Sequence, residues 1–384
     1  MQNDVDKYYT PASNTKILTL YTSLLHLTDE VPILQYRISG DTTYIRGVAH
    51  PGLLHPYLPS ASTTLTWLKD QPGHLVLVDR KADARYGPGW AWEDFSDYYQ
   101  PERSALPLHG NVMTIRADSA STSLLVQPKT FEVYQRTSSE PAETNPRIWR
   151  KDDLDNRWYY NGVASPRNLY RELPFHPGPG LQCLVLQEYL HKPVTWIPEQ
   201  EGMHIWYDLK SEIPLDSLYK LMMQVSDNFV AEQLLWMCAH QTHRMLYTDS
   251  IIHRMQHTKL AEITNALQWV DGSGLSRYNL FTPRSMVEIL DQIYSIKPLN
   301  WIQDIFPAGG QSGTLANWYK GPDGHPYLWA KTGSLWNQHT LSGYLITKRG
   351  RILIFSFMHN NFITTSTKLR REMQSILENI YGRF

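Results

Sequence analysis

Residues 10–27 read TPASNTKILTLYTSLLHL, and this stretch decides how the rest of the sequence is interpreted. Ser13 follows a Pro-Ala pair, Lys16 comes three residues later, and apolar residues then recur at helical spacing. The periodicity predicts a helix over 13–27 with one apolar stripe. A serine at a helix start is either a cap or a nucleophile. A lysine one turn further on is either a solvated charge or the base that takes the serine proton.

Composition limits the classes of function. The chain has 384 residues, of which 42% are hydrophobic and 19% charged, and this indicates a globular protein of two or three compact units. The formal net charge is −1, so we expect no nucleic-acid partner. No apolar run approaches the length of a transmembrane segment. Cys183 and Cys238 lack metal-binding spacing; they could form one disulfide, but we favour two buried free thiols.

The order of helical and strand patterns predicts the architecture. Helical periodicity recurs at 182–190, 214–225, 229–238, 283–294 and 366–381, and strand patterns occupy 75–78, 113–116, 327–333, 339–347 and 351–359. This order predicts an α/β (α+β) core with a β-rich insertion. We expect residues 1–35 and 181–384 to form the core, and residues 36–180 to form the inserted domain or domains.

Three short motifs occur in chain order, and their residues suit one chemistry. They are Ser13-x-x-Lys16, Ser226-Asp227-Asn228 and Lys331-Thr332-Gly333. A serine hydroxyl is a weak nucleophile until a base takes its proton, and Lys16 can be that base if burial and a nearby cation, Lys331, lower its pKa. Ser226 can relay a proton to a leaving amine, and the Asn228 amide can hold both Lys16 and a substrate amide.

The third motif suits substrate binding at the end of a predicted strand. Lys331 and the Thr332 hydroxyl suit a substrate carboxylate, and Gly333 lets a substrate backbone lie close. The backbone N–H of Ser334 could pair with that of Ser13 as an oxyanion hole.

Each motif alone is weak. S-x-x-K arises by chance about once in a chain of this length, and Ser217-Leu-Tyr-Lys220 is a second match, which we interpret as an ordinary helix with a solvated lysine. The ordered set, placed in suitable local structure, is what favours a serine enzyme.

The sequence around the motifs resembles the D-alanyl-D-alanine carboxypeptidase/endopeptidase family S13, the class C low-molecular-mass penicillin-binding proteins. The similar stretches are YYTPASNTKILTLYTSLLHL (8–27), VSDNFVAEQLL (225–235), DGSGLSRYNLFTPRSMVEIL (271–290), GGQSGTLANWYKG (309–321) and WAKTGSLWNQHTLSGYLITKRGRILIFSFMHNNF (329–362), and 87–113 is similar to the family's inserted segment. The resemblance implies a penicillin-recognising transpeptidase/β-lactamase-like core, an antiparallel sheet flanked by helices, with the insertion between the first two motifs. It implies Ser13 as the acylated nucleophile and Lys16 as its base.

The resemblance also implies an activity. We expect a serine D-Ala-D-Ala carboxypeptidase that acts on peptidoglycan stem peptides, is covalently inhibited by β-lactam antibiotics and needs no cofactor or metal. Endopeptidase cleavage of crosslinks stays open, and so do two alternatives. One is a class A-like β-lactamase, although the chain has no Glu-x-x-Leu-Asn segment. The other is a catalytically impaired cell-wall-binding protein.

The start of the chain and two further stretches complete these expectations. Family members carry strands and a secretion signal before the serine, but only 12 residues precede Ser13. We therefore expect a late start, and a periplasmic or cell-envelope location on resemblance alone. DGSGLS (271–276) is interpreted as a structural loop bordering the cleft, with a direct substrate role as the alternative. Trp90 and Trp92 would share one side of an extended segment, and we favour burial in the insertion over sugar binding.

Overall fold

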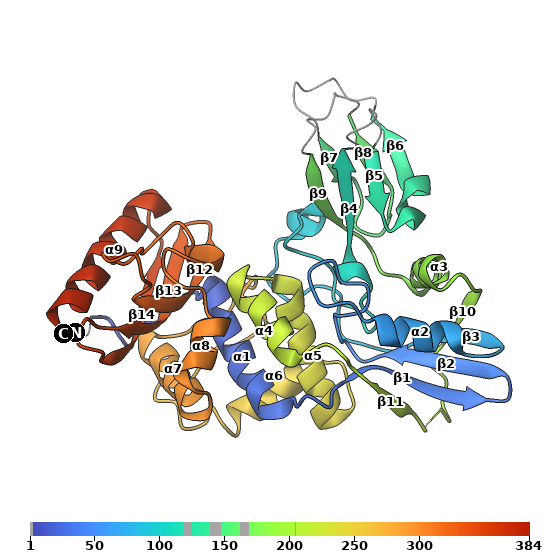
Figure 1. The fold of residues 1–384 in the computed structure, drawn as a ribbon, viewed down its shortest axis with the longest axis horizontal. Coiled ribbons are helices and arrows are strands. Elements are labelled where there is room, and N and C mark those ends of the chain that lie inside the picture. Colours follow the sequence, from blue (N-terminus) through green and yellow to red (C-terminus); the bar gives the residue numbers. More distant parts are fainter. Residues whose placement is uncertain (1–2, 118–123, 139–146, 162–168, 204) are drawn as a thin grey trace. The chain divides into compact units, whose positions relative to one another are not determined.

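The computed structural model describes residues 3–117, 124–138, 147–161, 169–203 and 205–384, and contacts divide the chain into two compact units (Figure 1). The first unit comprises Met1–Thr28, Gly87–Trp90 and Pro214–Phe384, and the second comprises Asp29–Tyr86 and Ala91–Ile213. The sequence predicts domain limits at 35/36 and 180/181, which differ from the limits of these two units. The predicted division into separate domains stays a prediction.

The first unit contains an antiparallel sheet in the order β12-β13-β14. Its strands are β12 (Leu328–Leu335), β13 (Gln338–Ile346) and β14 (Ile352–Asn360), and they agree with the three strands predicted near the C-terminus. The register between β12 and β13 is unbroken and places Lys331 opposite Ser342 and Ser334 opposite His339. The third motif therefore lies on the edge strand of this sheet, where each of its residues is paired with a residue of β13.

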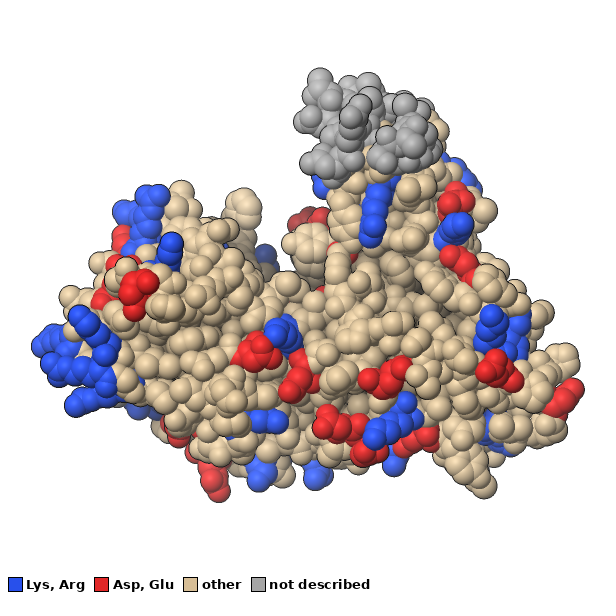
Figure 2. Space-filling model, viewed as in Figure 1, with Lys and Arg blue, Asp and Glu red and all other residues tan. Residues whose placement is uncertain are grey.

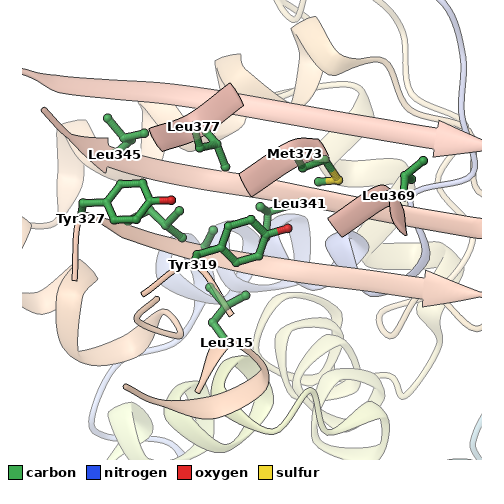
Figure 3. Packing of buried hydrophobic residues seen from close by; sticks show 10 residues of the cluster. Leu315, Tyr319, Tyr327, Leu341, Leu345, Leu369, Met373 and Leu377 are labelled. Atoms are coloured by element: carbon green, nitrogen blue, oxygen red, sulfur yellow. The ribbon is translucent and has the colours of Figure 1, made fainter. Parts of the chain in front are cut away.

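The C-terminal helix α9 (Ser366–Arg383) packs on this sheet, as its apolar spacing predicts. Figure 3 shows the shared core, in which Leu369, Met373 and Leu377 of α9 lie with Leu341 and Leu345 of β13. The predicted amphipathic helix is confirmed. Burial of such side chains contributes roughly 1.5–3 kcal/mol each, so this layer holds β12 and β13 firmly.

Helices form the rest of the first unit. They are α1 (Thr15–His26), α4 (Leu215–Gln224), α5 (Asn228–His243), α6 (Thr248–Gln256), α7 (Pro283–Ile296) and α8 (Leu299–Ile305). The predicted helices at 214–225, 229–238 and 283–294 are confirmed, whereas α6 and α8 are not predicted by the periodicity.

Helix α1 is buried more completely than its predicted apolar stripe indicates, because every residue from Thr15 to Ser23 is buried. Its polar residues are compatible with burial because their hydroxyl groups donate to backbone carbonyls. Thr22 donates to the carbonyl of Leu18 at 2.9 Å, and Ser23 donates to the carbonyl of Thr19 at 2.8 Å. The predicted helix is confirmed, and its burial extends beyond the apolar stripe to the polar residues beside it.

The second unit contains a mixed five-stranded sheet in the order β10-β3-β2-β1-β11 and two three-stranded sheets. The strands of the large sheet are β1 (Pro32–Ser39), β2 (Thr42–Gly47), β3 (His74–Asp79), β10 (Val194–Pro198) and β11 (Tyr207–Lys210). The small sheets are β5 (Leu124–Gln127), β4 (Val112–Ala117), β9 (Tyr170–Pro174), and β6 (Gln135–Thr137), β8 (Trp158–Tyr160), β7 (Ile148–Arg150). Helices α2 (Ser62–Asp70) and α3 (Pro179–Leu190) complete the unit, and the predicted segments 75–78, 113–116 and 182–190 are confirmed.

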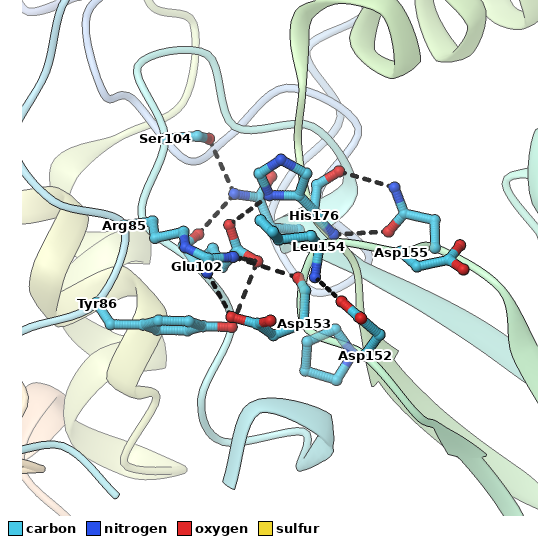
Figure 4. Close-up of polar contacts among 12 residues, drawn as sticks. Arg85, Tyr86, Glu102, Ser104, Asp152, Asp153, Leu154, Asp155 and His176 are labelled. Carbon is cyan, nitrogen blue, oxygen red and sulfur yellow. Dashed lines mark hydrogen bonds and ion pairs between the residues drawn. The ribbon is translucent and has the colours of Figure 1, made fainter. Parts of the chain in front are cut away.

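A buried carboxylate joins distant segments of the second unit (Figure 4). Glu102 is 1% exposed, and its two oxygens accept hydrogen bonds from Arg85 at 3.3 Å, Tyr86 at 3.3 Å and His176 at 2.8 Å. Arg85 also pairs with Asp153. A buried charge is tolerated only when it is paired and hydrogen-bonded, and these contacts meet that requirement.

Charged side chains of both signs are scattered over the face drawn in Figure 2, most of which is formed by uncharged residues, and Lys and Arg gather at the end of the first unit where α9 lies. Within the described parts of the chain, no helix combines the length and the apolar character needed to cross a membrane.

Candidate active site

Ser13 lies in the short 3-10 turn η1 (Ala12–Asn14) that leads directly into α1. Two side-chain contacts hold this turn against β13. Thr340 donates to the carbonyl of Pro11 at 2.8 Å, and the buried Asn14 amide donates to Ser342 at 2.7 Å. The serine is therefore positioned by the sheet as well as by its own helix.

Lys16 is completely buried one turn after Ser13. Its ammonium nitrogen donates to Ser13 Oγ at 3.0 Å, to Asn228 Oδ1 at 2.5 Å and to the Ser273 carbonyl at 2.6 Å. Burial lowers the pKa of Lys16 to about 8, although nearby carboxylates oppose that change. A lysine with this pKa has an appreciable neutral fraction near neutral pH and can accept a proton.

The second motif turns the chain sharply between two helices. Ser226 follows α4 with φ +66°, a left-handed conformation that costs a non-glycine residue free energy. Asp227 then caps α5, where its carboxylate accepts from the backbone N–H of Val230 at 2.8 Å. The cap fixes the first turn of α5, so Asn228 at its start is directed at Lys16.

Lys331 on β12 is also completely buried. Its ammonium nitrogen donates to Ser226 Oγ at 2.8 Å and to the carbonyl of Thr332 at 2.8 Å. Burial, followed by repulsion from Lys16, holds the pKa of Lys331 well below its ordinary value. Burial is likewise the main cause of the lowered pKa of Lys16.

The remaining third-motif residues each contact a specific neighbour. Thr332 Oγ1 donates to Thr314 Oγ1 at 2.8 Å, and Ser334 Oγ lies 2.9 Å from His339 Nδ1. At Gly333 an added Cβ would lie 2.4 Å from the hydroxyl of Thr340 and 2.6 Å from the carbonyl of Pro11. Packing against the turn that carries the serine is thus enough to require glycine here, before any substrate is considered.

The structure brings together residues from all three motifs. Ser13, Lys16 and Asn228 form one hydrogen-bonded set, and Ser226 and Lys331 form another. By contrast, Lys220 of the second S-x-x-K match is half exposed and pairs with Asp304 at 2.5 Å, so its interpretation as a solvated helix lysine is confirmed.

Two groups at the site carry no signal in the sequence. Thr314 carries no motif signal beyond its place in the GGQSGTLANWYKG stretch, yet its hydroxyl contacts Thr332. The 271–276 loop is interpreted from the sequence as a structural loop, with a substrate role as the alternative. It also supplies the Ser273 carbonyl, which accepts from Lys16. Contacts made by a backbone carbonyl leave no trace in residue type, so no pattern could have found this one.

The two tryptophans of the inserted segment behave differently. Trp92 is 81% exposed, so the expectation that both are buried in the insertion is wrong. Trp90 belongs to the first unit, and its indole N–H donates to Asp271 at 2.9 Å. A 3-10 turn begins at Trp92 (Trp92–Ser96), so the segment is not extended through both tryptophans. The alternation of an extended strand therefore does not place their side chains on one side.

Comparisons with known proteins place this geometry in context. Residues 194–380 match the model of the D-Ala-D-Ala carboxypeptidase 3 (S13) family. The chain is 28% identical over 378 residues to the D-alanyl-D-alanine carboxypeptidase DacB of Haemophilus influenzae, a match that covers 90% of this chain and 76% of that protein. It is 31% identical over 157 residues to the carboxypeptidase DacB of Mycolicibacterium smegmatis, covering 38% of this chain and 34% of that protein.

Solved structures agree on the fold. The crystal structure of penicillin-binding protein 4 from Haemophilus influenzae matches with a TM-score of 0.76 and 19% identity, over 100% of this chain and 92% of that one. A predatory peptidoglycan endopeptidase of Bdellovibrio bacteriovorus matches with a TM-score of 0.55 and 16% identity, over 100% and 88%. The predicted penicillin-recognising α/β fold is confirmed.

Proposed function

We propose that this chain, which matches the model of the D-Ala-D-Ala carboxypeptidase 3 (S13) family over residues 194–380, is a member of that family and a serine carboxypeptidase that removes the terminal D-Ala from peptidoglycan stem peptides. One observation carries the proposal for its mechanism. The hydroxyl oxygen of Ser13 lies 3.0 Å from the nitrogen of a completely buried Lys16. A nucleophile within hydrogen-bond reach of a base with lowered pKa is the arrangement that acyl transfer needs.

The acylation step uses neutral Lys16. With a pKa of about 8, roughly a tenth of the enzyme holds this amine uncharged at pH 7. Lys16 takes the Ser13 proton while the serine oxygen attacks the carbonyl carbon of the penultimate D-Ala. The backbone N–H groups of Ser13 and Ser334 are proposed to receive the negative charge that develops on the carbonyl oxygen.

Collapse of the tetrahedral intermediate requires a proton on the leaving nitrogen. Lys16 holds the proton taken from Ser13, and Ser226 relays a proton to the departing D-Ala amine as the C–N bond breaks. Lys331, which donates to Ser226 Oγ at 2.8 Å, orients that hydroxyl. An ester on Ser13 remains; water attacks it with Lys16 again taking a proton, which releases the shortened peptide carboxylate and restores Ser13.

The terminal carboxylate of the substrate is proposed to bind at Lys331 and Thr332. A bound anion would favour the protonated form of Lys331, whose pKa is lowered by burial. Asn228 accepts from Lys16 through its carbonyl oxygen at 2.5 Å, and its amide group is also proposed to contact the substrate amide. Gly333 keeps β12 close to the serine turn.

β-Lactam antibiotics are proposed to acylate the same serine. A structure of the Haemophilus protein is complexed with a β-lactam, and a related Bdellovibrio endopeptidase was solved acylated by penicillin G. Incubation with a fluorescent penicillin followed by intact-mass measurement tests this. We expect one adduct on the wild type, none on Ser13→Ala, and normal labelling of Lys220→Ala, which changes the other S-x-x-K. Equal labelling of wild type and Ser13→Ala would refute the nucleophile.

The substrate and the location need separate tests. D-Ala release from a pentapeptide ending in D-Ala-D-Ala should require Ser13, and assays on crosslinked muropeptides would decide whether the enzyme also acts as an endopeptidase. We propose a periplasmic location because stem peptides lie outside the cytoplasmic membrane. Recovery of the protein only in the cytoplasmic fraction of cells that carry its gene would contradict that location.

A further inference from the structure

Two carboxylates are completely buried beside the proposed base, and the chemistry above uses neither of them. Glu232 lies on α5, one helical turn after Asn228, and Asp271 opens the 271–276 loop. Both have 0% exposure. Burial of a carboxylate is strongly unfavourable unless hydrogen bonds or opposite charges compensate for the lost water. The partners of these two carboxylates therefore indicate what each of them does.

Glu232 shapes the backbone that reaches Lys16. Its Oε1 accepts from the backbone N–H groups of Gly272 at 2.9 Å and Ser273 at 2.7 Å. These two bonds hold the peptide so that the Ser273 carbonyl can accept from the Lys16 ammonium at 2.6 Å. The carboxylate thus acts on Lys16 through one intervening residue.

Asp271 holds the same loop together through hydrogen bonds with its backbone. Its two oxygens accept from the backbone N–H groups of Gly274 at 3.0 Å and Ser276 at 2.7 Å, and from the side chains of Asn279 at 2.7 Å and Trp90 at 2.9 Å. Each oxygen therefore accepts at least two donors. A loop tied in this way has little freedom to move the Ser273 carbonyl.

The loop also lies directly against the serine turn. An added Cβ at Gly274, whose φ is +83°, would lie only 1.9 Å from the carbonyl oxygen of Ala12, the residue before Ser13. On the other side of the loop, Thr19 of α1 donates to the carbonyl of Gly272 at 2.7 Å. The loop is therefore in contact both with the serine turn η1 and with α1 at Thr19.

We propose that Glu232 and Asp271 are positioning residues for Lys16: together they hold the Ser273 carbonyl against its ammonium group and supply the negative charge that balances it. This inference rests on the proposed function, because it gives the two carboxylates a role in preparing the base. Neither carboxylate touches the reacting atoms.

The charges around Lys16 support this role. Burial lowers its pKa, and Asp271, Asp227 and Glu232 each raise it, with a value of about 8 as the balance. Lys331 on β12 is the cation that faces it from the sheet. Loss of one carboxylate charge therefore moves the pKa of Lys16 further down, so the neutral amine appears at lower pH.

Two amide substitutions separate charge from shape. In Glu232→Gln the side-chain carbonyl oxygen can still accept from both backbone N–H groups, so these two bonds to the loop are kept while the charge is lost. In Asp271→Asn one of the two oxygens becomes an NH₂ group, which faces donors and cannot accept from them. That variant breaks the loop as well as removing the charge.

The test is the pH dependence of the acylation rate constant with a fluorescent penicillin, measured on the full chain together with the melting temperature. For Glu232→Gln we expect the midpoint of the rise in rate to move down by about half a pH unit or more, with the plateau rate within about threefold of wild type. For Asp271→Asn we expect the plateau rate to fall at least tenfold. Glu288→Gln is the matched control, because its exposed carboxylate also accepts from a backbone N–H, that of Thr264 at 2.9 Å.

The outcomes are separable. A midpoint for Glu232→Gln that equals that of wild type and Glu288→Gln would overturn the inference, even if the melting temperature falls, because a purely structural carboxylate lowers stability without moving the midpoint. Wild-type protein that is not acylated at any pH would overturn the proposed function itself, and this inference with it.

Discussion

Ser226 combines two properties that substitution can separate. Its hydroxyl accepts from Lys331 at 2.8 Å and is the proposed proton relay, and its backbone has φ +66°. Ser226→Ala removes the hydroxyl and keeps the strained Cβ, whereas Ser226→Gly removes both. The difference in stability between these two variants therefore reports the backbone strain, reduced by the greater freedom of glycine in the unfolded chain. The loss of activity that both variants share relative to wild type reports the hydroxyl.

The magnitude of the strain follows from the backbone angle. A left-handed conformation costs an L-residue about 1–2 kcal/mol, and glycine avoids that cost. Glycine also gives the unfolded chain more freedom, which offsets about 0.4–1 kcal/mol of the gain. Ser226→Gly should thus be more stable than Ser226→Ala by about 1 kcal/mol, which corresponds to about 2–4 °C in melting temperature for a unit of this size.

Melting curves and acylation rates of both variants test the reasoning, with Ser217 as the matched control. Ser217 lies within α4, where glycine is less stable than alanine by about 1 kcal/mol, so the order of the pair must reverse. Both Ser226 variants should acylate about 100-fold or more below wild type and within a few-fold of each other. Ser226→Ala melting at or above Ser226→Gly would refute the strain argument, and near-normal acylation would refute the relay.

Three further predictions concern the base, the sheet and the thiols. The acylation rate should rise with pH and level off above about pH 8, because the pKa of Lys16 is about 8 and only its neutral form takes a proton; a rate that is constant between pH 6 and 9 would contradict this. Gly333→Ala places a Cβ 2.4 Å from a threonine hydroxyl and should cost about 1–3 kcal/mol of unfolding free energy, measured against Gly382→Ala, where an added Cβ meets nothing within 4 Å. Cys183 and Cys238 are free and buried, and burial raises their pKa values to about 11 and about 12, so a thiol reagent should label two cysteines in denaturant and neither in the native protein.

Most of the first unit could be predicted from the sequence because its elements carry strong local signals. The strand patterns before and after the turn at Lys348–Gly350 locate β13 and β14, and the apolar spacing after Ser366 locates α9. The motif set could also be recognised, because the order of the three motifs limits the chemistry even where each motif alone occurs by chance. These are properties of residue type and spacing, which a sequence displays directly.

The contacts that complete the site do not follow from residue type or spacing. Lys16 meets Asn228 and Ser273 across 212 and 257 positions of sequence, and the left-handed backbone of Ser226 depends on how α4 ends against α5. Asn and Asp tolerate that conformation more readily than serine does, so residue type gave no hint of it. The position of Thr314 beside Thr332 likewise follows from packing and not from any local pattern.

Burial of two lysines is the strongest physical sign that this part of the core is not arranged for stability. Taking an ammonium group out of water costs several kcal/mol even after relaxation, whereas the buried apolar side chains beside these lysines, such as Ile17 on α1 and Ala330 on β12, carry no such cost. Lowered pKa values reduce the cost, because a neutral amine is cheaper to bury than an ammonium group. The same change makes Lys16 a base. Stability alone would place apolar side chains at both positions, so the presence of Lys16 and Lys331, each with its hydrogen bonds satisfied, argues that this core is arranged for proton transfer.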